Sequence, residues 1–139
     1  MKRLYKHHYI EEQRTYRGIQ YTILLNDAGW RTAYLNVTGS VLQNVDCNDI
    51  NVDVHGGLTW SDNRLPFETD IPENREFWYI GWDYAHYMDG FDFEAVIKYF
   101  GKVGINSLLQ RIGSHVFTLE DVRNDCIKAI NELHATGGK

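Results

Sequence analysis

Hydrophobic and polar positions alternate most regularly between residues 19 and 37. β-branched and aromatic side chains fill residues 19–25 and 30–37, and turn-forming Asn26, Asp27 and Gly29 lie between them. Two such runs around an Asn-Asp-x-Gly connection predict a β-hairpin.

Strand periodicity gives the second run of this hairpin two distinct faces. Ala33, Leu35 and Val37 share one of them, and Arg31 has the same parity. This places Arg31 at a strand end on the covered side of the sheet. An arginine in such a position pairs with a carboxylate, or else it binds a phosphate.

Further strands are predicted more weakly. Residues 51–55 read as a short strand, and residues 76–83 are aromatic on both parities, which is typical of a central strand covered on both faces. The polar residues 1–17 indicate a flexible or edge segment. The long polar loop 61–74 suggests a lid, a partner contact or simple mobility.

The C-terminal third has helical spacing. Apolar positions at spacings of three and four predict an amphipathic helix over residues 93–100. Thr118 as N-cap with Asp121 three residues later predicts a second helix. Its apolar stripe is Val122, Cys126, Ala129, Ile130 and Leu133, and residues 135–139 form a tail. The sum is a single α+β domain over 1–139, an antiparallel sheet of about four or five strands packed against one or two C-terminal helices.

The composition of the chain limits the classes of partner and the location that we expect for the protein. The net charge of −5 disfavours binding to polymeric nucleic acid, which uses clustered basic residues. Cys47 and Cys126 lack the spacing of a disulfide framework or a cysteine zinc site. No 18-residue apolar run occurs, so we expect no membrane span and a cytoplasmic location. The chain is rich in aromatics, with four Trp, nine Tyr and six Phe, and a minority of these rings could line a ligand site.

The first segment with candidate chemistry is residues 54–61. His55 precedes Gly56 and Gly57, and Thr59 adds a hydroxyl group. Paired glycines after a strand allow positive φ or a close approach by another group. The segment is either a tight turn with a structurally bonded histidine or part of a binding site.

The second segment with candidate chemistry is residues 78–89. Asp83, His86 and Asp89 are three residues apart. With His55 nearby, they would form a metal-binding set of two histidines and a carboxylate, or a histidine general base. Alternatively, Asp83 caps the turn and His86 bonds to it. This spacing is looser than that of established metal motifs, so from sequence we assign no metal ligand and no catalytic residue.

The two segments together resemble a family of small proteins encoded by phages and mobile elements. That family shares an HGGLTYS…GFDxAH pattern, matched here by residues 55–61 and 79–86. The resemblance runs from about residue 18 to residue 134. This chain differs in having Trp60 for Tyr, Trp82 for Phe, and an insertion-like stretch at 91–115.

The sequence is also similar to phage Thoeris anti-defence sponge proteins. This resemblance implies a non-catalytic protein without a cofactor, which sequesters a cyclic ADP-ribose-type immune signal in the host cytosol as a homo-oligomer. It implies that Trp82 stacks on adenine and that Arg31 and Arg111 hold the pyrophosphate.

Two other functions stay open. The acidic loop 61–74 and exposed aromatics would suit an inhibitor or adaptor that binds a host defence protein. His55, Asp83 and His86, together with Asp89, would suit a small metal-assisted hydrolase.

Overall fold

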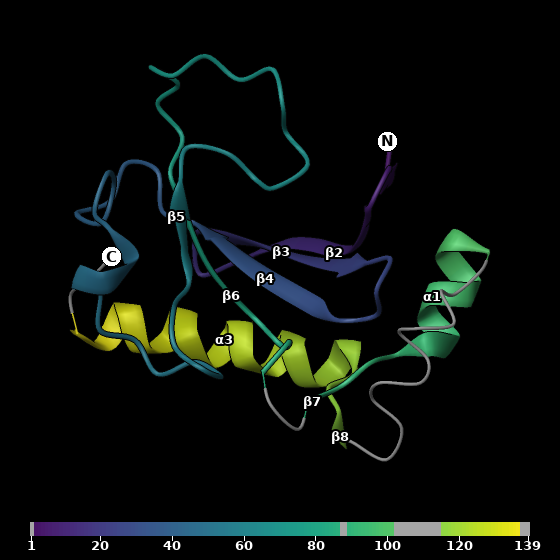
Figure 1. Cartoon of the computed structure of the whole chain (residues 1–139). Helices are drawn as coiled ribbons and strands as arrows, with labels where there is room; N and C mark the ends of the chain where they lie inside the picture. The colour runs from purple at the N-terminus through teal and green to yellow at the C-terminus, as the bar shows by residue number, and fades with distance from the viewer. Residues whose placement is uncertain (1, 87–88, 102–114, 137–139) are drawn as a thin grey trace.

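The computed structural model describes residues 2–86, 89–101 and 115–136. Its main sheet has six strands in the order β1-β2-β3-β4-β6-β5, and each neighbouring pair is antiparallel (Figure 1). These strands are β1 (Leu4–Tyr5), β2 (His8–Tyr16), β3 (Ile19–Asn26), β4 (Arg31–Asn36), β5 (Trp60–Asp62) and β6 (Tyr79–Asp83). The remaining elements are the 3-10 helix η1 (Cys47–Asp49), the parallel pair β7 (Asp89–Gly90) and β8 (His115–Val116), and the helices α1 (Phe93–Phe100) and α3 (Leu119–Thr136). The predicted α+β class is confirmed.

The predicted hairpin is formed by β3 and β4. The Asn26 side-chain oxygen accepts hydrogen bonds from the backbone N–H groups of Ala28, Gly29 and Trp30, at 3.0, 3.0 and 3.3 Å. Gly29 has a φ of 109°, which favours glycine. The central strand predicted around residues 76–83 is also confirmed, because β6 lies between β4 and β5 with four of its five residues buried.

The N-terminal segment agrees with the prediction of an edge segment only in part. β1 (Leu4–Tyr5) is an edge strand, but residues 8–16 form β2, which lies inside the sheet between β1 and β3. A register shift between Ile10 and Glu12 marks a bulge, and Glu11 and Glu12 are both buried. Each of these carboxylates is paired with a cation, as described below, so a polar sequence here conceals an interior strand.

Residues 51–54 also differ from the prediction, because they form no strand. Val52 and Val54 are nevertheless buried in the main apolar core. Irregular backbone therefore leads to His55.

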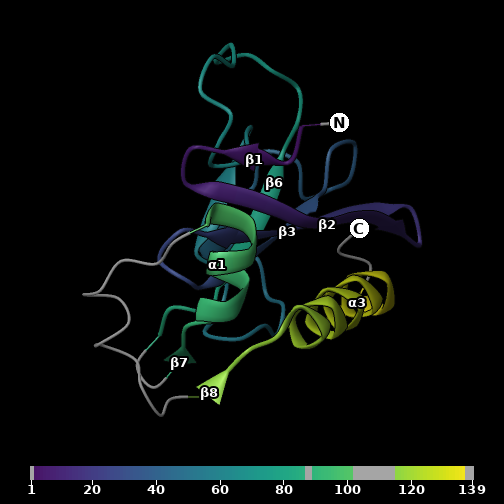
Figure 2. The same ribbon diagram turned by 90° about the vertical axis from the view of Figure 1, so that its right-hand side faces the viewer.

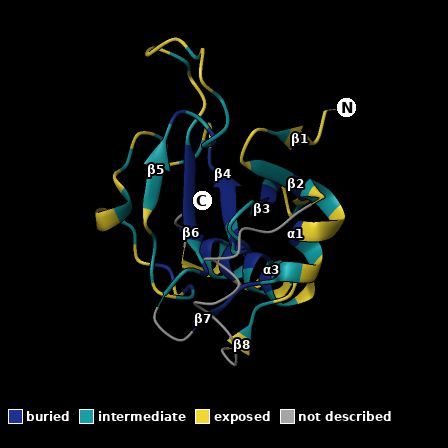
Figure 3. Cartoon of the chain, turned by 45° about the vertical axis from the view of Figure 1, so that its right-hand side comes forward, coloured by how far each residue is buried: buried dark blue, intermediate teal, exposed yellow. Residues whose placement is uncertain are grey.

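Helix α3 covers one face of the sheet (Figure 2). The predicted capping box is present: the Thr118 N–H donates to the Asp121 carboxylate at 3.0 Å, and the Asp121 N–H donates to the Thr118 hydroxyl at 3.2 Å. The predicted stripe of α3 is buried against β3, β4 and β6 (Figure 3). In the described part of the chain, neither helix has the length and apolar character needed to cross a membrane.

The opposite face of the sheet is covered in part by residues of the loop between β5 and β6, most of which extends away from α3 in Figure 1. Leu65 and Phe67 of this loop join a second apolar cluster with Tyr34 and Tyr79. The Asn63 amide donates to two carbonyl oxygens further along the same loop, at 3.3 and 3.1 Å. The loop therefore packs on the sheet and on itself.

Candidate metal centre

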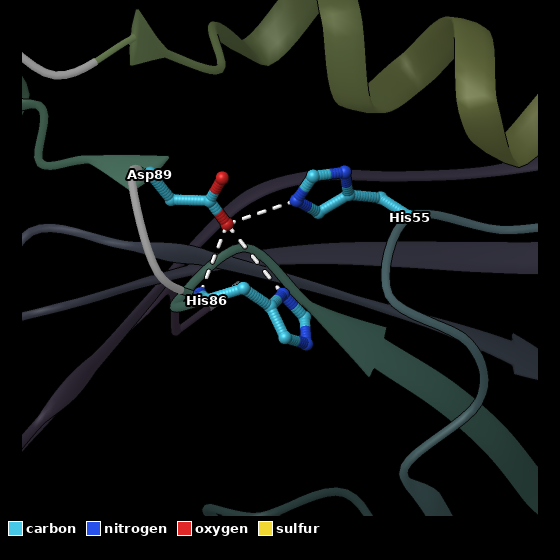
Figure 4. A group of neighbouring side chains, drawn as sticks. All are labelled: His55, His86 and Asp89. Atoms are coloured by element: carbon cyan, nitrogen blue, oxygen red, sulfur yellow. Dashed lines mark hydrogen bonds and ion pairs between the residues drawn. The ribbon is translucent and has the colours of Figure 1, made fainter.

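The turn containing His55 and the end of β6 meet in space, as the sequence analysis required for a shared site. His55 Nε2 lies 2.9 Å from Asp89 Oδ2. His86 Nδ1 lies 3.5 Å from the same oxygen. Figure 4 shows both imidazole rings directed toward the Asp89 carboxylate. Residues more than 30 positions apart in sequence thus contribute to one cluster.

His55 lies in a tight turn that contains Gly56 and Gly57. The Gly57 N–H donates to the Val54 carbonyl oxygen at 2.9 Å, which closes a turn with His55 and Gly56 at its centre. Gly56 has a φ of 70°. A Cβ atom at Gly56 would lie within 3.0 Å of three atoms of the His86 ring. Glycine is therefore required here for its conformation and for the space that the imidazole occupies.

Side-chain and backbone hydrogen bonds shape the segment after β6. The Ala85 N–H donates to Asp83 Oδ1 at 3.1 Å, a common use of aspartate in turns. The His86 N–H donates to Asp89 Oδ2 at 3.0 Å, and the Asp89 N–H donates to the His86 carbonyl at 2.9 Å. These bonds hold His86 and Asp89 close together.

The His55 ring packs against two aromatic rings. The ring stacks on Tyr84 with an interplanar angle of 4° and lies 4.4 Å, centroid to centroid, from Phe117. The Tyr84 hydroxyl donates to Asp125 of α3 at 2.6 Å and accepts from the Trp82 indole at 2.9 Å. Burial, and then the bond to Asp125, raise the pKa of Tyr84, so it stays a neutral donor.

The cluster has the composition and spacing of a metal site. Donor atoms of His55, His86 and Asp89 all lie within 4.8 Å of one another. Tetrahedral zinc with bonds of about 2.0–2.1 Å separates its ligand atoms by roughly 3.3 Å, so donor atoms as much as 4.8 Å apart would have to move closer by up to roughly 1.5 Å to bind such an ion. The side chains of His55 and His86 are 28% and 36% exposed, whereas that of Asp89 is 7% exposed. The cluster therefore combines a buried carboxylate with two partly exposed imidazoles.

Several residues predicted as a site are brought together. Gly56 lies against the His86 ring, and Gly57 belongs to the same turn. The Thr59 hydroxyl donates to Asp83 Oδ2 at 3.1 Å. Asp83 Oδ1 in turn lies 3.6 Å from His86 Nε2.

Two roles implied by the resemblance do not fit this geometry. Trp82 is 1% exposed in the core beneath α3, so no face of its indole is open for stacking on adenine. The buried Arg31 guanidinium donates to Glu11 at 2.6 and 3.0 Å, and to Asp92 and the Phe117 carbonyl at 2.9 Å each. Arg31 therefore pairs with carboxylates, which is one of the two alternatives that its strand position allowed. Its guanidinium is engaged within the protein and is not placed to bind a phosphate. Arg111 lies outside the described residues.

Some contributors were not identified from sequence. Asp89 was considered through its D-x-x-H-x-x-D spacing, but that spacing alone did not show that it would face both histidines. Its importance depends on the turn that folds it back on His86. Tyr84, Phe117 and Asp125 carry no motif, because their roles arise from ring packing and from the position of α3.

Comparisons with protein-family models, curated proteins and solved structures found no match to this chain.

Proposed function

We propose that this protein is a small metal-dependent hydrolase whose divalent transition-metal ion is bound by His55, His86 and Asp89. The observation that carries the proposal is the convergence of their three donor atoms within 4.8 Å. Two imidazoles and one carboxylate are a usual ligand set for catalytic zinc, and they also suit iron(II).

The chemistry follows from the number of protein ligands. Three such ligands leave coordination positions for water and for a substrate oxygen. A zinc ion held by these residues would lower the pKa of a bound water to about 7 and would supply a nucleophile for hydrolysis at neutral pH. The partly exposed imidazoles keep this face of the centre accessible to a small molecule.

The sequence offered two carboxylates, Asp83 and Asp89, for a metal-assisted hydrolase. In the described residues, the convergent group includes Asp89 rather than Asp83. Asp89 is also better placed than Asp83 to share a metal ion with both histidines. Its Oδ2 lies 2.9 Å from His55 Nε2 and 3.5 Å from His86 Nδ1.

Capture of a nucleotide signal, binding to a host defence protein, assembly into homo-oligomers and a cytosolic location remain predictions from sequence. The nucleotide hypothesis has less support than the metal hypothesis, because Trp82 and Arg31 are buried and bonded within the protein. Native mass spectrometry with cyclic nucleotides tests both capture and subunit number.

The test of the proposed function is hydrolysis by untagged protein. Metal-free protein is loaded with Zn²⁺, Mn²⁺, Co²⁺ or Fe²⁺ and given an activated phosphodiester and an activated carboxylic ester as probes. We expect turnover with at least one metal, reversal by a chelator, and a loss of at least about 100-fold in His86→Ala.

The matched control is His7→Ala. It also removes one imidazole, but from an exposed residue that pairs with Asp27. Activity that survives chelation, or that is equal in His86→Ala and the wild type, would contradict the proposal. If a contaminating enzyme caused the hydrolysis, further purification would lower the activity of the wild type and of both variants to the same extent.

A further inference from the structure

We propose that Asp83 is a positioning residue, which accepts the Nε2–H of His86 and so makes Nδ1 of His86 the atom that binds metal. This inference rests on the proposed metal function and deepens it, because it assigns the ligand atoms and a second layer of support.

The first step is the place of the His86 ring between two carboxylates. Its Nδ1 lies 3.5 Å from Asp89 Oδ2, and its Nε2 lies 3.6 Å from Asp83 Oδ1. A neutral imidazole carries one proton, so metal binding at one nitrogen leaves the other as an N–H donor. Because His55 Nε2 and Asp89 lie on the Nδ1 side (Figure 4), the proton belongs on Nε2, facing Asp83.

The second step is that the Asp83 carboxylate is already held in place. Its Oδ1 accepts from the Ala85 N–H and its Oδ2 accepts from the Thr59 hydroxyl, each at 3.1 Å. Thr59 is itself fixed by its N–H, which donates to the Gly81 carbonyl of β6 at 2.9 Å. Both residues are thus tied to the end of one strand, and a shift of the His86 ring by a few tenths of an ångström would bring Nε2 within hydrogen-bond distance of Asp83.

The third step concerns the freedom of the ring. Gly56 lies so close to the His86 ring that a Cβ atom there would overlap it. With backbone on this side, Asp89 at Nδ1 and Asp83 at Nε2, the ring has one favourable orientation. Metal-binding histidines commonly donate their second nitrogen to a carboxylate in this way, which fixes the tautomer and raises ligand basicity.

The test measures zinc affinity by competition with a chromophoric chelator. We expect Asp83→Ala to weaken zinc binding about 10–100-fold, the usual cost of losing a carboxylate behind a histidine ligand. Thr59→Val, which removes only the hydroxyl that holds Asp83, is expected to have a smaller effect in the same direction. Asp70→Ala is the control for net charge, since it removes an exposed carboxylate from the loop between β5 and β6.

Asp83→Asn separates the turn from the charge. Its amide oxygen can still accept from Ala85 and from His86, so the segment should keep its shape while the ligand loses its anionic partner. An affinity between those of the wild type and Asp83→Ala is expected. This variant keeps the test valid if Asp83→Ala lowers the melting temperature of the metal-free protein.

Nitrogen-15 NMR of the imidazole rings gives a readout that a purely structural role of Asp83 would not produce. In the zinc-loaded wild type we expect His86 to be protonated at Nε2 and metal-bound at Nδ1. Zinc bound through Nε2, or an Asp83→Ala affinity within about twofold of the wild type, would overturn the Asp83 assignment alone. A wild type that binds no zinc would overturn the metal function together with it.

Discussion

Substitution of Gly56 by alanine tests the geometry of the site at a single atom. The added Cβ would lie within 3.0 Å of His86 Cε1, Nε2 and Nδ1, whereas ordinary contact begins at 3.4 Å. The imidazole would therefore have to move by roughly 1 Å, out of the position in which its Nδ1 faces Asp89.

Gly57→Ala is the matched control. Gly56 and Gly57 have φ values of 70° and 80°, so alanine at either position adopts an unfavourable left-handed conformation at a cost of about 1 kcal/mol. A Cβ at Gly57 meets no heavy atom within 4 Å. The difference between the two variants therefore reports the overlap with His86 and not the backbone strain.

The His86 side chain is 36% exposed, so it can rotate toward solvent to relieve the overlap. We therefore expect similar losses of unfolding free energy in both variants, about 1–2 kcal/mol by urea denaturation of metal-free protein. Zinc affinity should fall by at least about 100-fold in Gly56→Ala and remain near wild type in Gly57→Ala. Equal zinc affinity in the two variants would refute the arrangement of the glycine turn against His86.

Three further predictions concern the scaffold. Glu12→Gln should lower the unfolding free energy at pH 7 by about 1–3 kcal/mol, because Arg123 loses its carboxylate partner. The hydrogen bond from Arg123 lowers the pKa of Glu12, so this stabilisation is present above the ordinary carboxyl pKa and is lost as pH falls. A difference in unfolding free energy between wild type and Glu12→Gln that is as large at pH 3 as at pH 7 would contradict this prediction. Burial raises the pKa of the Cys126 thiol, so mass spectrometry should find Cys126 alkylated by iodoacetamide only after unfolding. Alkylation of Cys126 in the native protein at the same rate as half-buried Cys47 would argue against this prediction. Gly81→Ala should cost about 1–3 kcal/mol in urea denaturation, because its Cβ would lie 2.6 Å from both the Ala33 carbonyl oxygen and the Tyr34 ring, and a loss below about 0.5 kcal/mol would show that β6 can shift.

Local patterns predicted most of the scaffold. The β3–β4 hairpin, the central strand β6 and the capped helix α3 each depend on residues adjacent in sequence, whose turn, alternation and capping preferences agree with the fold. Strand β2 could not be found in this way. Its buried Glu11 and Glu12 are stabilised by Arg31 and by Arg123, which lies 111 positions further along the chain.

The candidate site was predictable only in part. The glycine turn and the D-x-x-H-x-x-D spacing identified the two segments that meet, because both local features restrict the backbone. Which carboxylate faces His55 depends on the hydrogen bonds between His86 and Asp89, which residue spacing does not specify. The burial of Trp82 follows from packing under α3, which its place in a local motif could not reveal.

The central claim is tested most directly by isothermal titration of Zn²⁺ into metal-free, untagged protein. We expect one ion per chain for the wild type and for His7→Ala, and at least about 100-fold weaker binding for His86→Ala. Equal binding by His86→Ala and the wild type, or no saturable binding by the wild type, would contradict the assignment of His55, His86 and Asp89 as a metal centre.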